Sequence, residues 1–282
     1  MNSIRKGKYV SRISHDNDII FLVDKIITKN NQKIALLTGI VERVEADSPL
    51  EDLKIVNKKV VYENLRNLDK KIKNRLDTTL NSIKTKKDIF SRSNNFENKI
   101  ITGKILHLDG DKKYSEKSYY YYKKVGLNAI VKNVPEYKQP KIVYNLLTIY
   151  KPDILIITGH DGMIKKDMGY NDIYNYRNSR HFINTVKEAR RYDAETNNHT
   201  VIFAGACQSY FEALIIAGAN FASSPARILI DFLDPLIIAE KVAFTEKYKY
   251  ITIDDIATEL RDGKRGVDGI GANGKMVKLK FT

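Results

Sequence analysis

Two residue types that can do chemistry together, a cysteine and a histidine, each follow an apolar run of the sequence. Cys207 is the single cysteine among 282 residues, and it ends the stretch TVIFAGAC. His160 ends the stretch DILIITGH, roughly 50 residues earlier. A thiol becomes a nucleophile at neutral pH when a nearby base or cation favours the thiolate, and an imidazole can serve as that base. The pair therefore predicts nucleophilic catalysis, provided that the fold brings the two side chains together.

The part of the chain after residue 100 alternates between two kinds of pattern, which predicts how these side chains are positioned. Short runs of apolar and β-branched residues predict strands, and longer stretches with apolar residues every three or four positions predict helices. Strands are expected over 104–111, 128–134, 153–162 and 200–209, separated by helices over 115–126, 140–152 and 177–193. This order predicts an α/β fold with a mainly parallel sheet and helices on both of its faces.

The carboxyl ends of the strands are where the working residues of an open α/β sheet lie. That rule selects Asp109 and Asp111 after the first strand, His160 after the third and Cys207 after the fourth. We therefore expect the thiol and the imidazole to meet at one edge of the sheet. The stretch QSYFEALIIAG after the cysteine predicts a helix whose N-terminal amides favour a thiolate. The small residues 204–206 leave room for a substrate backbone.

The cysteine and the histidine also have simpler interpretations. A single cysteine in an apolar strand is usually a small buried hydrophobe, and His160 stands in a Gly-His-Asp-Gly turn that could be merely polar. The other histidines are weaker candidates for a base, because His181 falls in a predicted helix and His199 in the turn before a strand. The topology, which pairs Cys207 with His160, favours the catalytic interpretation.

Four long segments of the chain carry more information than the pattern of strands and helices: GKYVSRISHDNDIIF, GHDGMIKKDMGYNDIYNYRNSRHF, FAGACQSYFEALIIAGANFASSPARILID and ELRDGKRGVDGIG. They resemble the YabG family of sporulation-specific proteases of endospore-forming bacteria, within the wider group of caspase-like cysteine peptidases. The resemblance implies a caspase-like sheet and an endopeptidase that trims spore-coat and germination-related proteins, with a preference for cutting after arginine. It implies action in the cytoplasm of the sporulating cell and at the forming spore coat, and it raises the question of self-cleavage.

By this resemblance, Cys207 is the nucleophile and His160 assists proton transfer. The oxyanion of the reaction is expected to be held by the backbone amide of Cys207 and by one amide of the turn after the histidine. Many caspase-like enzymes have Gly directly after this histidine, whereas Asp161 separates His160 from Gly162 here. Either turn amide is therefore a candidate. Asp161 itself is expected to be an exposed turn residue, with orientation of the imidazole as the alternative.

A substrate arginine needs a carboxylate that offers two oxygens to its guanidinium. Asp109 and Asp111 end the first strand on the same edge as the predicted dyad, and Asp111 is favoured because it lies farther beyond the strand. An ordinary acidic turn is the alternative for both. The reserve candidates for the pocket acid are Asp231 and Asp234, and the backbone of Ala222, Ser223 and Ser224 is expected to form the pocket wall.

Two regions precede the predicted peptidase domain of residues 100–282. Residues 1–55 contain short β-rich runs between turn signals, which predicts a small antiparallel SH3-like β-barrel. Residues 56–99 predict an amphipathic helix that ends in a polar linker at 91–99. The apolar positions of this helix are Val61, Leu65, Leu68, Ile72, Leu76, Leu80 and Ile83.

The composition narrows the classes of partner. The net charge of +14 comes from 48 Lys and Arg that are scattered along the chain, which is typical of a solvated basic surface rather than a nucleic-acid site. No run approaches the roughly 18 apolar residues of a membrane span, and no secretory signal is expected. One cysteine cannot form an internal disulfide, which suits a reducing cytosol. Protein substrates are the expected partners, and no cofactor or metal is expected because HExxH and paired-cysteine motifs are absent.

Two other classes of function remain as alternatives. A phospho-accepting receiver-type switch also has acidic residues after its first strand, but it needs a lysine after the fifth, and NFASSPARILID offers none there. A non-enzymatic basic adaptor would bind coat protein or nucleic acid through the N-terminal barrel. The GxGxxG match at 269–274 lacks the strand and helix of a dinucleotide site, so a flexible glycine-rich loop is expected there.

Overall fold

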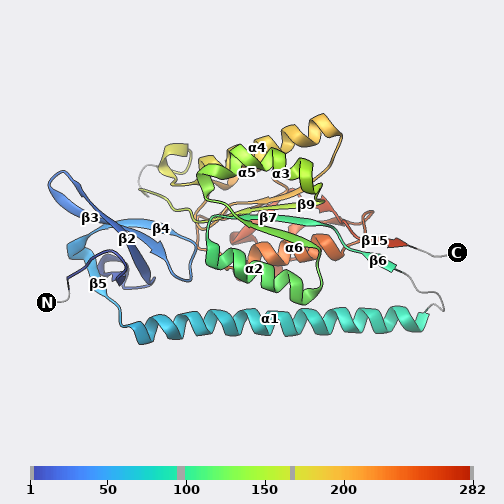
Figure 1. The fold of residues 1–282 in the computed structure, drawn as a ribbon, viewed down its shortest axis with the longest axis horizontal. Coiled ribbons are helices and arrows are strands. Elements are labelled where there is room, and N and C mark those ends of the chain that lie inside the picture. Colours follow the sequence, from blue (N-terminus) through green and yellow to red (C-terminus); the bar gives the residue numbers. More distant parts are fainter. Residues whose placement is uncertain (1–2, 94–98, 166–168, 280–282) are drawn as a thin grey trace.

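A six-stranded sheet forms the centre of the molecule (Figure 1) in the computed structural model, which describes residues 3–93, 99–165 and 169–279. Its strand order is β13-β11-β10-β9-β7-β8. Five strands are parallel, and β13 runs antiparallel to β11. The strands are β7 (Ile105–Asp109), β8 (Ala129–Asn133), β9 (Ile154–Thr158), β10 (Val201–Ala204), β11 (Phe221–Ser223) and β13 (Val267–Gly269). The predicted α/β fold with a largely parallel sheet is thus confirmed.

The order of the parallel strands reverses between β7 and β9, because the chain first adds β8 on one side of β7 and then continues on the other. In sheets of this kind the crevice outside the carboxyl ends at the reversal point is the usual place for a ligand. Asp109 closes β7, and His160 lies two residues beyond the end of β9. Two of the predicted site residues therefore flank this point.

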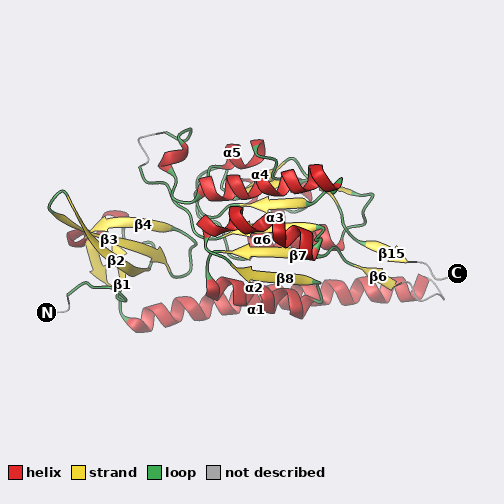
Figure 2. Ribbon diagram, turned by 45° about the horizontal axis from the view of Figure 1, so that its top comes forward, coloured by secondary structure: helices red, strands yellow, loops and turns green. Residues whose placement is uncertain are grey.

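Helices cover both faces of the central sheet (Figure 2). One apolar cluster joins residues of α1, α2 and α6 to one face of the strands. A second cluster joins α3, α4 and α5 to the other face. The strands are buried on both faces, which explains their nearly continuous apolar sequences. The helices are α1 (Lys58–Ser93), α2 (Lys112–Val125), α3 (Gln139–Tyr150), α4 (Ser179–Thr196), α5 (Phe211–Ile216) and α6 (Asp234–Phe244).

The long helix α1 runs beside α2 along the length of the molecule (Figure 1). Its apolar stripe behaves largely as predicted, since Val61, Leu68, Ile72 and Leu76 are buried, while Leu80 is 41% exposed. The predicted polar linker is not observed as such. Residues 91–93 belong to α1 and Lys99 begins β6, while residues 94–98 lie outside the described part of the chain.

The N-terminal region forms a five-stranded antiparallel sheet with the order β4-β3-β2-β1-β5. Its strands are β1 (Tyr9–Arg12), β2 (Phe21–Lys29), β3 (Gln32–Gly39), β4 (Glu45–Pro49) and β5 (Leu53–Ile55). Within the described residues β4 and β5 lie at opposite edges and do not pair with each other. The antiparallel sheet is as expected, but a closed SH3-like barrel is not confirmed.

The C-terminal glycine-rich segment is not the flexible loop that its composition suggested. Gly269 ends β13, and the next residues form β14 (Ala272–Asn273), which pairs with β12 (Tyr250–Ile251). A Cβ on Gly269 would collide with the carbonyl oxygen of Asn220, so the missing side chain lets β13 approach β11. A further pair joins β15 (Val277–Leu279) to β6 (Lys99–Ile101).

The N-terminal sheet packs against the carboxyl edge of the central sheet. Val44, just before β4, forms a parallel bridge with Asp161, just beyond β9. Cys207 and Ile230 belong to the apolar cluster of the N-terminal sheet rather than to either cluster of the central sheet. Among the described residues, no helix is both long and apolar enough to cross a membrane.

Candidate active site

Cys207 lies on a tight elbow three residues after β10. Gly205 makes the elbow possible, because its φ of +113° belongs to glycine and a Cβ there would collide with Ser223 Oγ. The helix expected directly after the cysteine is shorter and later than predicted. It begins at Phe211 and has six residues, so its N-terminal amides are not placed to favour a thiolate at Cys207.

The Cys207 thiol is fully buried. Its Sγ accepts a hydrogen bond from the Ile230 amide at 3.4 Å and lies 3.8 Å from the Ile230 carbonyl oxygen. Burial raises the pKa of the thiol to about 11, against smaller opposing effects of hydrogen bonds from the Ile230 and Arg43 backbone. The thiol is therefore protonated at neutral pH.

His160 lies two residues beyond the end of β9, and β9 is the strand that pairs with β10. Two groups fix its backbone: its amide donates to Glu136 Oε1 at 2.8 Å, and its carbonyl accepts from Asn178 Nδ2 at 2.9 Å. Its Nε2 is buried without a hydrogen-bond partner among the described residues, and Asp111 Oδ2 lies 3.8 Å away. Burial lowers the pKa of the imidazole, although the Asp111 charge acts to raise it. His160 therefore places a neutral imidazole, with Nε2 unpartnered among the described residues, at the carboxyl edge of the central sheet.

Asp161 is not the exposed turn residue that the sequence suggested, because it is fully buried. Its carboxylate accepts hydrogen bonds from the amides of Gly162 and Asn178 and from the hydroxyls of Ser179 and Ser209. The burial follows from the Val44 bridge, which covers the turn with a strand of the N-terminal sheet. Asp161 thus ties β9, α4 and the cysteine elbow together.

Asp109, the last residue of β7, is fully buried. Its Oδ2 accepts hydrogen bonds from Arg43 Nη2 at 2.5 Å and from Thr158 Oγ1 at 3.0 Å. Its Oδ1 accepts a hydrogen bond from the Asp111 amide at 2.8 Å. Burial opposes ionisation of this carboxyl, yet the Arg43 guanidinium and His107 hold its pKa well below the ordinary range. Asp109 is therefore a fixed, charged carboxylate that holds an arginine.

The other predicted pocket residues have separate surroundings. Asp111 caps α2 by accepting from the amides of Lys113 and Tyr114. Ser223 and Ser224 are buried, and their hydroxyls donate to the Ala206 and Ile228 carbonyls at 2.8 and 2.7 Å. Asp231 lies 3.3 Å from Lys71 Nζ of α1, and Asp234 accepts from the Asp231 and Arg261 amides.

Three residues of this edge are absent from the sequence-based predictions: Arg43, Tyr114 and Glu136. The Tyr114 ring lies 6.3 Å from the His160 ring and 5.1 Å below the Arg43 guanidinium carbon. Glu136 could have been suspected from Gly110 and Gly159, which follow two neighbouring strands. A Cβ on either glycine would collide with the Glu136 carboxylate, so both make room for the group that anchors the histidine.

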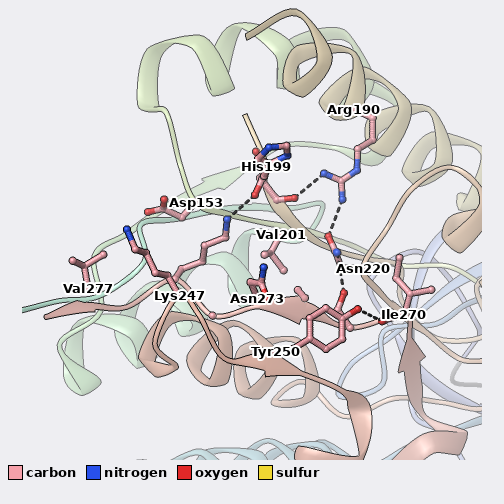
Figure 3. Close-up of a pocket in the computed structure, with 15 residues that line it drawn as sticks. Asp153, Arg190, His199, Val201, Asn220, Lys247, Tyr250, Ile270, Asn273 and Val277 are labelled. Atoms are coloured by element: carbon pink, nitrogen blue, oxygen red, sulfur yellow. Dashed lines mark hydrogen bonds between the residues drawn. The ribbon is translucent and has the colours of Figure 1, made fainter. Parts of the chain in front are cut away.

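A cavity of about 630 Å³ lies elsewhere, at the amino ends of the strands (Figure 3). Asp153 and Thr200, which precede β9 and β10, contribute to its lining. Arg190 in this cavity already donates to the Thr200 carbonyl and to Asn220, each at 2.7 Å. None of the predicted site residues lines this cavity, so it is distinct from the carboxyl edge.

A parallel sheet that places a thiol and a free imidazole nitrogen beyond neighbouring strands defines a class of protein suited to nucleophilic chemistry. Residues 5–280 match the family model of YabG peptidase U57. The chain is also 36% identical over 275 residues to the Sporulation-specific protease YabG of Bacillus subtilis (strain 168), with 95% of this chain and 94% of that protein covered. This chain therefore belongs to the YabG peptidase family, which supports a protease role in sporulation. No solved structure matches it.

Proposed function

We propose that the protein is a caspase-like cysteine endopeptidase that cuts after arginine, with Cys207 as nucleophile and His160 as the group that transfers protons. The observation that carries the proposal is the position of the thiol and the unpartnered imidazole nitrogen beyond the neighbouring strands β10 and β9, in a chain of a peptidase family. By the same membership, its substrates are proposed to be spore-coat and germination-related proteins in the sporulating cell and at the forming coat.

The protonation states of the two groups suit attack with simultaneous proton transfer. The Cys207 thiol is neutral because burial raises its pKa to about 11, and burial keeps His160 neutral by lowering its pKa. As the sulfur attacks the scissile carbonyl carbon, the imidazole accepts the thiol proton and then delivers it to the leaving amine. Water next hydrolyses the thioester, which releases the acid product and restores the thiol.

The amide of Asp161 is the turn donor that fits the oxyanion. The Gly162 amide already donates to the Asp161 side chain at 2.9 Å, whereas the Asp161 amide faces a carbonyl oxygen of the Arg43 backbone at 3.3 Å. A substrate carbonyl that took the place of the Arg43 carbonyl would accept from the Asp161 amide, next in the chain to His160, the proposed base. We therefore assign the oxyanion to the amides of Asp161 and Cys207.

Asp109 is the carboxylate that fits a substrate arginine, rather than Asp111. Asp109 Oδ2 already pairs with the Arg43 guanidinium at 2.5 Å. Hydrogen bonds from the Thr158 hydroxyl and the Asp111 amide fix the two carboxylate oxygens. A fixed carboxylate recognises the charge without having to be ordered first. Asp111, which caps α2 and faces His160 Nε2 at 3.8 Å, is assigned to the imidazole instead.

Cleavage of a short unstructured peptide with one arginine tests this function. The Cys207→Ala and His160→Ala variants should each lose at least about a hundredfold in kcat/KM, since removal of a dyad member has large effects. His181→Ala and His199→Ala serve as matched controls and should retain most of the parental activity. If the peptide is cut equally by the parent and by Cys207→Ala, the thiol is not the nucleophile. If no preparation cuts it, the basic adaptor is the better interpretation.

A further inference from the structure

The cavity of about 630 Å³ at the amino ends of the central strands (Figure 3) has a volume typical of small-molecule sites. Part of its lining is the glycine-rich segment 270–274, which the peptidase chemistry does not use. Asp153 and Thr200 also line it, and they directly precede β9 and β10. A ligand here would therefore contact the starts of the two strands whose other ends lead to His160 and Cys207.

Two lysine side chains bring positive charge to this cavity. The segments that carry them run side by side, because the Lys247 amide donates to the Met276 carbonyl at 3.1 Å. Lys247 is exposed, whereas Lys275 is partly buried and its Nζ donates to the His199 carbonyl at 2.6 Å. Among the residues that the structure describes, neither lysine forms an ion pair. Both ammonium groups are therefore open to an anion.

The carboxylates near these lysines do not balance their charge. Burial lowers the pKa of the Lys275 ammonium, while the charges of Asp153 and Asp193 act to raise it. Asp193 already pairs with Arg190 at 2.6 Å. Asp153 supplies the one carboxylate of the described lining and also accepts from the Lys104 amide at 2.8 Å. Since a nearby anion stabilises a partly buried cation, an anionic ligand would supply the missing charge.

The kind of cation favours a phosphate over a carboxylate. Arg190 also lines the cavity, but its Nε donates to the Gly218 carbonyl at 2.8 Å. Its Nη1 donates to the Thr200 carbonyl and its Nη2 to Asn220 Oδ1, each at 2.7 Å. The planar fork that suits a carboxylate is thus already engaged. The remaining cations are ammonium groups, which act as point charges and are common ligands of phosphate.

The glycine-rich segment holds an aromatic ring beside these cations. Gly271 has a φ of +86°, and a Cβ there would collide with the Tyr250 ring, so the ring lies against the bare backbone. The Tyr250 hydroxyl donates to the Ile270 carbonyl at 2.5 Å (Figure 3). The ring is nevertheless 58% exposed. An exposed ring that is held in place offers a stacking surface to a planar group.

We propose that this cavity binds a small phosphate monoester with a planar ring, of the nucleoside monophosphate class. The phosphate lies on Lys247 and Lys275, and the ring of the ligand lies on Tyr250. This mode differs from a dinucleotide site, because side chains rather than the start of a helix hold the phosphate. The proposal does not rest on the proposed function, since none of these residues takes part in peptide cleavage.

Calorimetric titration and thermal unfolding of the full chain with adenosine monophosphate (AMP) test the proposal. The parent should bind AMP with a Kd below about 1 mM, and adenosine and ribose phosphate should each bind at least about tenfold more weakly. Lys247→Gln and Lys275→Gln should each weaken AMP binding at least about fivefold. Tyr250→Leu should weaken AMP binding but change ribose phosphate binding less than about twofold. The matched control is Lys249→Gln, which removes a lysine paired with Glu246 at 3.2 Å outside the lining and should change neither affinity.

The possible results separate this site from a general attraction to a basic surface. If millimolar AMP gives neither binding heat nor a rise in the thermal midpoint, the proposal is wrong. Binding that the two lysine variants leave unchanged, or that Lys249→Gln weakens equally, also overturns it. Inorganic phosphate that binds as tightly as AMP overturns the contact with Tyr250 and makes the free ion the ligand. Lys247 is exposed, so its variant decides the question even if Lys275→Gln does not fold.

Discussion

At the scale of the residue, Asp109 and Asp111 lie two positions apart, but their burial and contacts differ and suit them to different roles. Asp109 ends β7 inside the sheet and is fully buried against Arg43 and Thr158. Asp111 begins the cap of α2, is partly exposed, and faces His160 Nε2 at 3.8 Å. One carboxylate is placed for a guanidinium, and the other for the imidazole.

Asp111→Asn should therefore alter the pH profile and not the specificity. Asparagine is a good helix cap, so α2 should persist. Burial lowers the pKa of His160 and the Asp111 charge acts to raise it, so loss of that charge lowers the pKa further. The base then stays deprotonated to more acidic pH, and the acid limb of kcat/KM against pH should move to lower pH. The ratio of kcat/KM for arginine and glutamine peptides should change by less than about twofold.

The companion variant is Asp109→Asn, made together with Arg43→Gln so that no buried charge loses its partner. Against Arg43→Gln alone, it should reduce the preference for arginine over glutamine at least about tenfold, mainly through KM. Peptide competition assays measure this ratio directly. Should Asp111→Asn reduce the preference while Asp109→Asn leaves it unchanged, the two assignments must be exchanged.

At the scale of the element, the sequence predicts those features that depend on near neighbours. Short runs of apolar and β-branched residues locate β7, β9 and β10, and apolar residues every three or four positions locate most of α1. The rule about carboxyl strand ends brings His160 and Cys207 to one edge. The pattern around the cysteine is less reliable, because tertiary packing delays α5 until Phe211. Short helices depend on such packing more than on propensity.

Contacts between distant elements could not be predicted in this way. The buried Asp161 carboxylate accepts hydrogen bonds from the hydroxyl groups of Ser179 and Ser209, 18 and 48 positions away. Arg43 meets Asp109 across 66 positions, between two separate sheets. A spacing argument therefore favoured Asp111 as the pocket acid, since nothing local in the sequence shows that an arginine from the other sheet points at Asp109.

The elbow between β10 and α5 offers a prediction about backbone conformation. Gly205→Ala should destabilise the protein by about 2–4 kcal/mol, because it adds a positive-φ penalty to a collision with Ser223 Oγ. It should also reduce kcat, since the elbow carries Cys207. Gly126→Ala is the matched control: its φ is +76° but a Cβ there meets nothing within 4 Å. That variant should cost about 1 kcal/mol and retain kcat. Urea unfolding and peptide assays check both, and equal effects would mean that the elbow is not strained.

At the scale of the whole molecule, the site is built from two sheets and not from one. The central sheet supplies Cys207, His160 and Asp109, the proposed dyad and the proposed pocket acid. The N-terminal sheet supplies the segment that covers them, through the Val44 bridge to Asp161 and the apolar cluster shared with Cys207. The high pKa of the thiol follows from this cover, since its largest cause is burial. Any treatment that weakens the contact between the sheets should therefore make Cys207 more reactive.

Glu45 gives that contact a dependence on pH. Burial, followed by the charge of Glu136, raises its pKa to about 7 from an ordinary value of 4.5. A carboxyl whose pKa is raised by folding contributes stability that is fully present below its unfolded pKa and is lost as pH rises through its folded pKa. Stability should therefore fall between about pH 4.5 and pH 7. The difference in pKa corresponds to roughly 3 kcal/mol at most, and partial exposure of Glu45 reduces this to about 1–3 kcal/mol.

Glu45→Gln, made in the Cys207→Ala background, should remove this dependence because a neutral amide needs no proton to remain buried. Its thermal midpoint at pH 8 should exceed that of the background by a few degrees, at roughly 2–4 °C per kcal/mol, and the two should converge at pH 4.5. The alkylation measurement uses the His160→Ala variant, which keeps Cys207. Its rate of Cys207 alkylation by a small reagent should rise with pH, and it should rise less steeply once Glu45→Gln is added. Glu63→Gln on the exposed face of α1 is the control and should change neither measurement. A Glu45→Gln midpoint that falls with pH as steeply as the background would place the titrating group elsewhere in the contact between the sheets.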